Sequence, residues 1–291
     1  MSSIEQIELT EWSGPFTADS SARAIAALEE GKVLFFPHLV FPLLDGERAL
    51  LSPDVANQNR KNITLDPRSG QTHGVSEGEE IGQLVQGLLS RYGAAAKALV
   101  SGLFPQYVPA LEQARTTFRP IEIEGREYKP RQDDRRLHVD AFPTRPTGGR
   151  RILRVFSNIA PAKGRVWRVG EPFENFAKTY APKLRNPNAA AAWLLHRVGI
   201  TKAQRSGYDQ LMLQLHDLAK LDDAYQASAP QERVEFPPNT AWMCFTDQVL
   251  HAALAGQFAL EQTFHMPVDV MARPQTAPIK VLERITARAL H

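Results

Sequence analysis

Two histidines and one aspartate are the residues of this sequence best suited to bind a metal ion. His138 and Asp140 lie two positions apart, and in an extended segment residues at this spacing point to the same side. A distant His251 can supply a third ligand. Two imidazoles and one carboxylate form the facial triad of non-haem Fe(II) sites, which leaves metal positions for a co-substrate and oxygen. The sequence therefore predicts a metal site that is open on one side.

The His-x-Asp tripeptide is a weak signal when it stands alone. With 8 histidines and 13 aspartates in 291 residues, about 0.36 chance matches are expected, and a structural or surface His–Asp pair is the simpler interpretation. The surroundings of His251 change this balance, because it lies in a strand-rich tail between Leu250 and Ala252. A buried imidazole there needs a partner for its nitrogens, and a metal ion supplies one.

The remaining histidines are weaker candidates. His265 ends the last expected strand and is the best substitute ligand if His251 fails. His216 lies in a helical segment, where a solvated or capping role is the better interpretation. His38 falls within an apolar strand, so we expect a buried core residue with a satisfied side chain.

Basic residues gather around the His-x-Asp motif, although the net charge of the chain is only +2. They are Lys129, Arg131, Arg135, Arg136, Arg145, Arg150, Arg151, Arg154, Lys163, Arg165 and Arg168. Such an excess concentrates positive potential at the opening of the expected metal site. The planar arginine guanidinium can donate two hydrogen bonds at once to a carboxylate or a phosphate. For any single one of these basic residues, an ordinary surface charge without a binding role is about as good an interpretation. Arg154 differs because it lies inside an apolar strand, where its charge requires a counter-ion; an acidic ligand can provide one.

The elements that must position these residues are strands on both sides of a helical block. We expect strands near 33–40, 116–123, 152–159, 233–236, 240–245, 248–253 and 258–265, and helices over 19–28, 76–103 and 279–290. Asp19 or Ser20 is expected to cap the first helix, and Ser76 with Glu79 the second. Residues 42–75 have no clear period, so they predict a long loop with a function or with partial mobility.

A parallel βαβ sheet would alternate strand and helix more regularly than this. The pattern favours an α+β fold with a double-stranded β-helix core, of the jelly-roll or cupin-like kind, and flanking helices. We expect one domain over residues 1–291, with a helical insertion at about 172–226.

The composition excludes several classes of protein. A chain with 43% hydrophobic and 23% charged residues is neither collagen nor a coiled coil nor wholly disordered. A single cysteine, Cys244, excludes a disulfide framework and a cysteine-based zinc site. No run approaches the length of a membrane span, and the N-terminal residues lack a signal-peptide pattern. We therefore expect a cytoplasmic protein without a nucleic-acid partner.

Three segments together resemble a known family. Residues 138–156 (HVDAFPTRPTGGRRILRVF), 245–252 (FTDQVLHA) and 256–264 (GQFALEQTF) are similar to the Kdo hydroxylases, Fe(II)- and 2-oxoglutarate-dependent dioxygenases of Gram-negative bacteria. The similarity extends through most of the chain and is far more specific than His-x-Asp alone. It implies hydroxylation of carbon 3 of the outer Kdo sugar of Kdo2-lipid A, which gives Ko, succinate and CO2.

The resemblance also assigns roles by position. His138, Asp140 and His251 match the iron ligands of the family, with Fe(II), 2-oxoglutarate and O2 as the required partners in the reaction. Many relatives bind the far carboxylate of 2-oxoglutarate with an arginine ten to fourteen residues after the distal histidine, but this window has none here. We therefore assign the co-substrate to Arg154, with Gln262 and Thr263 as hydrogen-bonding partners. The acidic groups of a Kdo-lipid A acceptor are assigned to Arg136, Arg145 and Arg150.

Two other functions stay open on the sequence. One is the same oxygenase chemistry on another acidic small molecule or glycolipid, since fold and triad do not fix the substrate. The other is a non-catalytic cupin-like binding protein with a vestigial metal cluster. A lipid-linked acceptor would require peripheral contact with the inner membrane, to which the basic surface and the 42–75 segment can contribute. The number of subunits cannot be read from the sequence.

Overall fold

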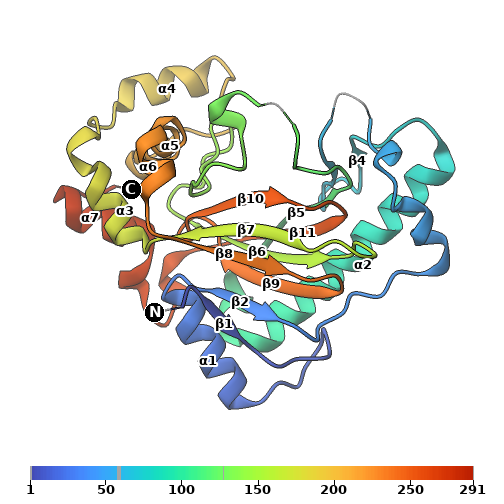
Figure 1. Ribbon diagram of the computed structural model, residues 1–291. Coiled ribbons are helices and arrows are strands. Elements are labelled where there is room, and N and C mark those ends of the chain that lie inside the picture. The colour runs from blue at the N-terminus through green and yellow to red at the C-terminus, as the bar shows by residue number, and fades with distance from the viewer. Residues whose placement is uncertain (1, 58–59, 127, 291) are drawn as a thin grey trace.

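Two facing β-sheets form the centre of the molecule (Figure 1). The computed structural model describes residues 2–57, 60–126 and 128–290. The large sheet has the strand order β1-β2-β9-β6-β11-β5-β3-β4, and the small sheet has the order β10-β7-β8. Apart from the parallel β1–β2 pair, neighbouring strands are antiparallel. The predicted double-sheet, jelly-roll type of fold is confirmed.

The strands come from three parts of the chain, residues 4–73, 112–170 and 231–266. The large sheet contains β1 (Ile4–Gln6), β2 (Val33–Phe36), β3 (Ile63–Leu65), β4 (Thr72–His73), β5 (Glu112–Arg119), β6 (Arg151–Asn158), β9 (Thr240–Phe245) and β11 (Ala259–Met266). The small sheet contains β7 (Arg165–Gly170), β8 (Gln231–Phe236) and β10 (His251–Ala255). All six residues of β9 are buried, because the small sheet covers one face of the large sheet and helices cover the other.

Helices pack around the two sheets, as Figure 1 shows. They are α1 (Ala18–Glu29), α2 (Glu79–Leu103), α3 (Phe173–Tyr180), α4 (Ala189–Arg197), α5 (Gly207–Leu221), α6 (Asp223–Ser228) and α7 (Pro278–Thr286). Helix α2 lies against the outer face of β5 and β11. Its Gly93 permits this approach, since a Cβ there would come within 3.0 Å of Gln262 Oε1. Helices α3–α6 lie between β7 and β8 in sequence; that they are an insertion in a single domain stays a prediction.

An aromatic stack fills the space between the sheets beside the site. Trp242 of β9 stacks on Phe236, with ring centroids 4.2 Å apart and an interplanar angle of 6°, and on Phe156 at 5.2 Å. Trp167 of β7 meets the Trp242 ring edge-on at 5.6 Å. Aromatic pairs in these geometries add to the gain from burial, so the stack holds β7 in a fixed position opposite the large sheet.

Several local expectations were wrong, and each has a physical reason. Thr17, not Asp19 or Ser20, caps α1 by accepting a hydrogen bond from the Ser20 backbone N–H at 3.1 Å. Helix α2 begins after Gly78 (φ 135°) without a side-chain cap, so Ser76 has no capping role. Strand β2 ends at Phe36 because Pro37 follows, and proline cannot donate to a ladder.

The described part of the segment 42–75, residues 42–57 and 60–75, has more regular structure than its sequence suggests. It contains the short 3-10 helices η1 (Asp45–Leu50) and η2 (Pro53–Val55) and then β3 and β4, which extend the large sheet past β5. Strands of three and two residues carry too little periodicity to be recognised in a sequence. Strand β7 was not predicted, because its basic and apolar residues resemble the surrounding loops.

A buried ion pair secures the start of β6. Arg151 Nε lies 2.7 Å from Asp247 Oδ2, both side chains are 1% exposed, and the guanidinium lies 3.7 Å from the Phe245 ring centroid. Removing one partner leaves an uncompensated buried charge, so Asp247→Ala should lower the free energy of unfolding by about 3–5 kcal/mol. Urea denaturation measures this change. The exposed Asp269→Ala is the control, and a loss for Asp247→Ala no larger than that of the control would contradict the prediction.

Candidate metal centre and adjoining cavity

The three predicted ligands meet at one point between the sheets. His251 is the first residue of β10, and its backbone exchanges hydrogen bonds with His138 at 2.9 and 3.1 Å. The Asp140 backbone N–H donates to the Thr246 carbonyl at 2.8 Å. These bonds draw the 138–140 segment against the loop before β10. One ligand atom from each of the three side chains lies within 4.8 Å of the other two.

Hydrogen bonds orient both imidazole rings toward this point. His138 Nδ1 lies 2.8 Å from the Arg136 carbonyl, and His251 Nδ1 lies 2.9 Å from the Val249 carbonyl. A carbonyl only accepts, so each Nδ1 carries the proton and each Nε2 keeps its lone pair. That is the tautomer of a metal-binding histidine held by a backbone acceptor. His251 also stacks on Trp167 at 5.2 Å, which fixes the plane of its ring.

The electrostatics keep the cluster in its metal-binding protonation state. Burial and the neighbouring His251 hold the pKa of His138 well below its ordinary value, and burial likewise lowers the pKa of His251. For Asp140, burial alone would raise the pKa. The effects of Arg154 and then of the two imidazoles outweigh burial, so the pKa of Asp140 is lowered. Neutral imidazoles and an ionised carboxylate are the forms that bind a metal.

The donor set fits a divalent first-row metal ion. His138 Nε2 lies 3.9 Å from Asp140 Oδ1. Asp140 Oδ2 is buried and accepts no hydrogen bond from the described residues, although Arg154 Nη2 lies 3.2 Å away. A buried carboxylate oxygen without a donor is costly. Two imidazoles with one carboxylate suit Fe(II) and related metals.

Low pKa values make metal binding resistant to acid. An ordinary imidazole here would have a pKa of 6.5, and protons would compete with the metal below that pH. Because both histidine pKa values are lowered, Co(II) affinity measured by titration should stay flat as the pH falls through 6.5 and decline only in more acidic buffer. Without metal, the unfolded chain takes up protons below 6.5 that the folded chain refuses, so stability should fall with the pH. A tenfold weakening of Co(II) binding for each pH unit from 6.5 downward would contradict this prediction.

Helices α5 and α6 support the first ligand, which the sequence did not reveal. The Gln226 side chain accepts from the Leu137 N–H at 2.8 Å and donates to the Leu137 carbonyl at 3.0 Å, in the manner of a neighbouring strand. His216 packs edge-on against His138, with centroids 5.5 Å apart. The expected solvated or capping role of His216 is therefore wrong. No sequence signal links one turn of a helix to a ligand about 80 residues earlier.

A cavity of about 90 Å³ opens beside the three ligands. Its walls come from β5, β6 and β11 of the large sheet and from β7 and β10 of the small sheet. Among the lining residues the cationic side chains are Lys61, Arg119, Arg126, Arg154 and Arg165, and the carboxylates besides the ligand Asp140 are Asp134 and Glu261. Among the described lining residues, five cations therefore face three carboxylates, which favours an anionic ligand.

Arg154 lies in this cavity, where the sequence places it, but protein carboxylates already neutralise it. Its guanidinium is 3.2 Å from Asp140 and 3.4 Å from Glu261. Arg119 also pairs with Glu261, at 2.6 Å. The counter-ions that the buried charge of Arg154 requires are therefore Asp140 and Glu261 of the chain itself.

Arg126 and Arg165 are the two cavity cations without a carboxylate partner among the described residues, and of the two only Arg165 is buried. Arg165 is 4% exposed, donates to the Gly256 carbonyl at 2.7 Å and has no partner for Nε. Burial, followed by the nearby Arg119, lowers the pKa of Arg165 to about 9. The indole Nε1 of Trp167, two residues along β7, is also a buried donor without an acceptor. Nothing in the sequence distinguishes Arg165 from the other basic residues, because only the register of β7 directs its side chain inward.

A larger groove continues from the cavity, with a volume of about 720 Å³. Arg119, Arg154 and Glu261 line both spaces. The groove also contains Thr263, Arg145 and Arg150 of the predicted site, of which Arg150 pairs with Glu112. Thr263 lies beside Glu261, 3.4 Å from its carboxylate.

Two predicted site residues lie elsewhere. Gln262 faces α2, because strand neighbours alternate between faces; its amide oxygen accepts from Thr116 at 2.6 Å and its nitrogen donates to the Ala114 carbonyl. Arg136 pairs with Asp223 of α6 and lines neither space. The structure thus brings neither side chain to the cavity.

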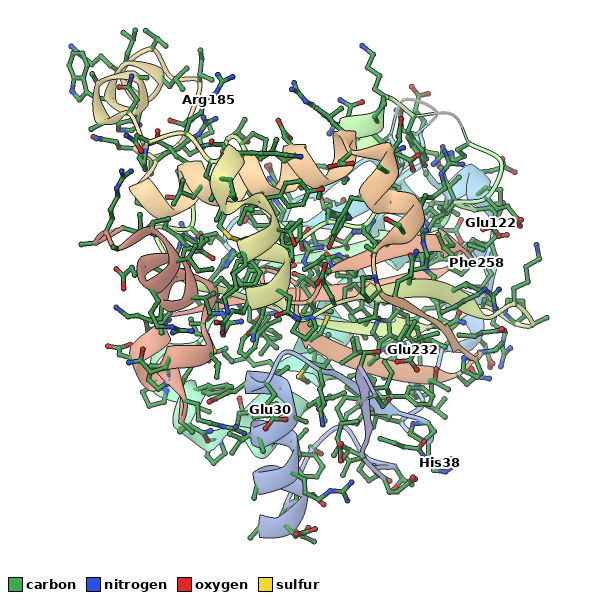
Figure 2. The ribbon with its side chains drawn as sticks, turned by 60° about the vertical axis from the view of Figure 1, so that its left-hand side comes forward. Glu30, His38, Glu122, Arg185, Glu232 and Phe258 are labelled. Carbon is green, nitrogen blue, oxygen red and sulfur yellow. The ribbon has the colours of Figure 1, made fainter. Side chains whose placement is uncertain are left out.

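Two other histidines are placed by their contacts. His265 lies in the groove and bonds to the Arg151 carbonyl at 3.2 Å, so it does not join the metal cluster. His38 was expected in the core, but its side chain is 63% exposed and lies 3.3 Å from Glu8. Figure 2 shows it at the outer edge of the molecule.

The fold and the three-residue cluster define a class, the non-haem metal oxygenases of the jelly-roll type. The family description "3-deoxy-D-manno-oct-2-ulosonic acid (Kdo) hydroxylase" matches residues 11–289. The chain therefore belongs to the Kdo hydroxylase family, which confirms the family predicted from the sequence.

Solved structures agree with this assignment. The chain is similar to the Kdo hydroxylase KdoO, a non-heme Fe(II) alphaketoglutarate-dependent dioxygenase, in complex with alphaketoglutarate and Fe(III) (49% identity, 99% of this chain and 97% of that chain covered, TM-score 0.95). The cobalt(II) complex matches with 49% identity, the same coverages and a TM-score of 0.96. The complex with succinate and Fe(III) matches with 48% identity, again the same coverages and a TM-score of 0.95. No curated protein sequence matches this chain.

Proposed function

We propose that this chain hydroxylates carbon 3 of the outer Kdo sugar of Kdo2-lipid A, with Fe(II), 2-oxoglutarate and O2 as partners in the reaction. The chain is an Fe(II)- and 2-oxoglutarate-dependent dioxygenase of the Kdo hydroxylase family, as its sequence predicts. The observation that carries the assignment is the buried His138–Asp140–His251 cluster beside a cavity with surplus positive charge. The two alternatives from the sequence, another acidic acceptor or a binding protein without activity, are not favoured.

The three clustered side chains would hold the iron through their free Nε2 atoms and the Asp140 carboxylate. When bound, Fe(II) with 2-oxoglutarate supplies the oxidation that transfers one oxygen atom of O2 to the sugar and the other to succinate, with loss of CO2. The chain's own contribution is to fix the ligands, exclude water from between the sheets and orient both organic acids.

The cavity cations would orient 2-oxoglutarate. Arg165 and the Trp167 indole offer buried donors without acceptors among the described residues, which suits a carboxylate between the sheets. Arg154 remains our predicted co-substrate residue, and its contact with Asp140 places it where a ligand of the metal can reach it. Thr263 lies in the adjoining groove near Glu261.

The groove would receive the acidic acceptor. Arg145 and Lys202 line it and form no ion pair with any carboxylate of the described residues. Arg150 shares Glu112 with Arg68, so two cations face one carboxylate. This leaves charge for the carboxylate of a Kdo sugar and for the phosphates of lipid A. Arg136 stays a predicted substrate residue on sequence grounds alone.

A lipid-linked acceptor implies contact with a bilayer surface. Among the described residues, no helix is both long and apolar enough to cross a membrane. We therefore propose that the protein meets its acceptor by peripheral contact with the inner membrane.

Mass spectrometry tests the proposed reaction. Purified protein with Fe(II), 2-oxoglutarate, O2 and Kdo2-lipid A should add one oxygen atom to the outer sugar and release one succinate for each oxygen transferred. Kdo-free lipid A and other sugar acids serve as matched acceptors. Oxygen transfer to those acceptors alone would reject Kdo as the substrate, and metal binding without succinate release from any acceptor would indicate a binding protein.

A further inference from the structure

Helix α4 exposes an apolar surface that the rest of the chain does not cover. Of its nine residues only Ala192 is buried. Trp193 and Leu194 are each 54% exposed, and Val198 and Ile200, just past its end, are 58% and 54% exposed. In Figures 1 and 2, α4 projects from the body of the molecule, away from the two sheets. We define these four residues as the α4 apolar patch. Several large apolar side chains exposed within eight residues of one another indicate a contact site.

The sequence around the α4 apolar patch is strongly basic. Residues 175–208 contain six lysines and arginines and no aspartate or glutamate, in a chain whose net charge is +2. Among the described residues, Arg185, Arg197 and Lys202 form no ion pair with a carboxylate. Arg185 is labelled beside α4 in Figure 2. Large apolar side chains with unpaired cations around them suit an interface whose surface is anionic and whose interior is apolar.

The α4 apolar patch is directly followed in the sequence by residues that line the proposed acceptor groove. Lys202 and Ala203 line the groove only two and three residues after Ile200. The Lys202 backbone N–H donates to the Thr144 carbonyl at 2.9 Å, and Arg205 donates to the Pro143 carbonyl at 3.2 Å through Nε. These bonds tie the end of the α4 segment to the 143–144 wall of the groove. A binding partner that contacts the α4 apolar patch would therefore lie close to the groove.

We propose that the α4 apolar patch and its flanking arginines dock the protein on an anionic lipid bilayer and present the groove to a lipid-linked acceptor. This rests on the proposed function for the identity of the acceptor, but the docking is a separate property. A second copy of the chain is the poorer occupant, because two such patches would bring their unpaired cations together. Leu44, in the 42–75 segment from which apolar contact was expected, is also exposed (59%) but lies outside the basic segment.

Vesicle flotation tests the docking. Wild type should bind phosphatidylcholine vesicles that contain phosphatidylglycerol, and less so in high salt. Trp193→Ser with Leu194→Ser should weaken binding at least tenfold, and Arg185→Glu with Arg197→Glu by roughly 25-fold or more, at about fivefold per cation lost. Val40→Ser with Leu44→Ser removes two apolar residues of similar exposure elsewhere and should leave binding unchanged.

Tryptophan fluorescence gives an independent readout of the same contact. Trp193 is the most exposed of the four tryptophans, so lipids brominated on their acyl chains should quench its emission. Trp193→Phe should still float with the vesicles but lose this quenching. Quenching that persists in Trp193→Phe would place another tryptophan at the lipid and overturn the proposal.

Two further measurements separate this proposal from the proposed function. Hydroxylation of a water-soluble, deacylated Kdo acceptor should be the same in wild type and in Trp193→Ser with Leu194→Ser. Failure of wild type on that acceptor counts against the hydroxylase assignment and not against docking. Absence of vesicle binding by wild type, or binding that survives the Trp193 and Leu194 changes, would overturn the docking surface. Self-association that those changes abolish would assign the patch to a second copy instead.

Discussion

His138→Ala should abolish both metal binding and hydroxylation while the chain stays folded. His138 supplies one of three donors within 4.8 Å of one another, and the described residues offer no other nitrogen at that position. Loss of a direct ligand should weaken Co(II) or Fe(II) binding by more than about 100-fold, beyond what loss of an outer partner costs. Activity should fall to about one thousandth or less. Metal titration followed by optical absorption and succinate release measure the two effects.

His265→Ala is the matched control for this prediction. It removes a half-buried imidazole from β11 that the sequence offers as a substitute ligand, but whose Nδ1 bonds to the Arg151 carbonyl in the groove. Stoichiometric metal binding should persist in this variant. If His265→Ala loses the metal while His138→Ala keeps it, the metal does not bind at the His138–Asp140–His251 cluster.

The cluster of three candidate metal ligands could be predicted because its signal is local and chemical. His138 and Asp140 lie two positions apart in an extended segment, and His251 stands in an apolar strand where an imidazole needs a partner. The same holds for the fold, because β6 and β9 are largely apolar segments between clear turns, so their existence and type follow from the sequence. The double-sheet arrangement then follows from the irregular alternation of strands and helices.

The rest of the site depends on strand register and on side-chain direction, which a sequence does not state. Gln262 and Thr263 are neighbours, yet one faces α2 and the other the groove, because a single-residue step reverses the face. Arg154 needed a counter-ion, and two carboxylates provide it. Asp140 lies 14 residues earlier in the chain, and Glu261 lies on the neighbouring strand β11. Gln226 reaches Leu137 across 89 residues. Contacts of this kind appear only once the chain has folded.

Surface and core were also misjudged where a short element ended early. His38 follows the apolar Val33–Phe36 run, and a strand extended to residue 40 would bury it. Pro37 ends the strand first and turns His38 outward. The proline outweighs the apolar pattern here because it removes the backbone donor that the ladder requires.

Arg165→Met should raise the 2-oxoglutarate concentration needed for half-maximal activity on the order of 100-fold, since a buried charge-assisted bond to a carboxylate is lost. It should also make the metal-free protein more stable by about 1 kcal/mol or more, because the wild-type chain buries this guanidinium without a carboxylate partner among the described residues. Binding machinery that lowers stability is the expected compromise at an active site. Steady-state kinetics and urea denaturation measure the two changes.

The controls for Arg165 come from the same sheet. Arg168→Met changes an arginine of β7 that bonds to the Arg135 carbonyl and does not line the cavity, so the 2-oxoglutarate requirement should not change. Arg154→Met should raise the requirement sharply if the sequence-based assignment holds, but it should also weaken metal binding, because Asp140 loses its cationic partner. Added 2-oxoglutarate should stabilise wild type and not Arg165→Met, since a ligand stabilises only the form that binds it. If the 2-oxoglutarate requirement is unchanged in Arg165→Met but rises strongly in Arg154→Met, Arg154 alone binds the co-substrate carboxylate.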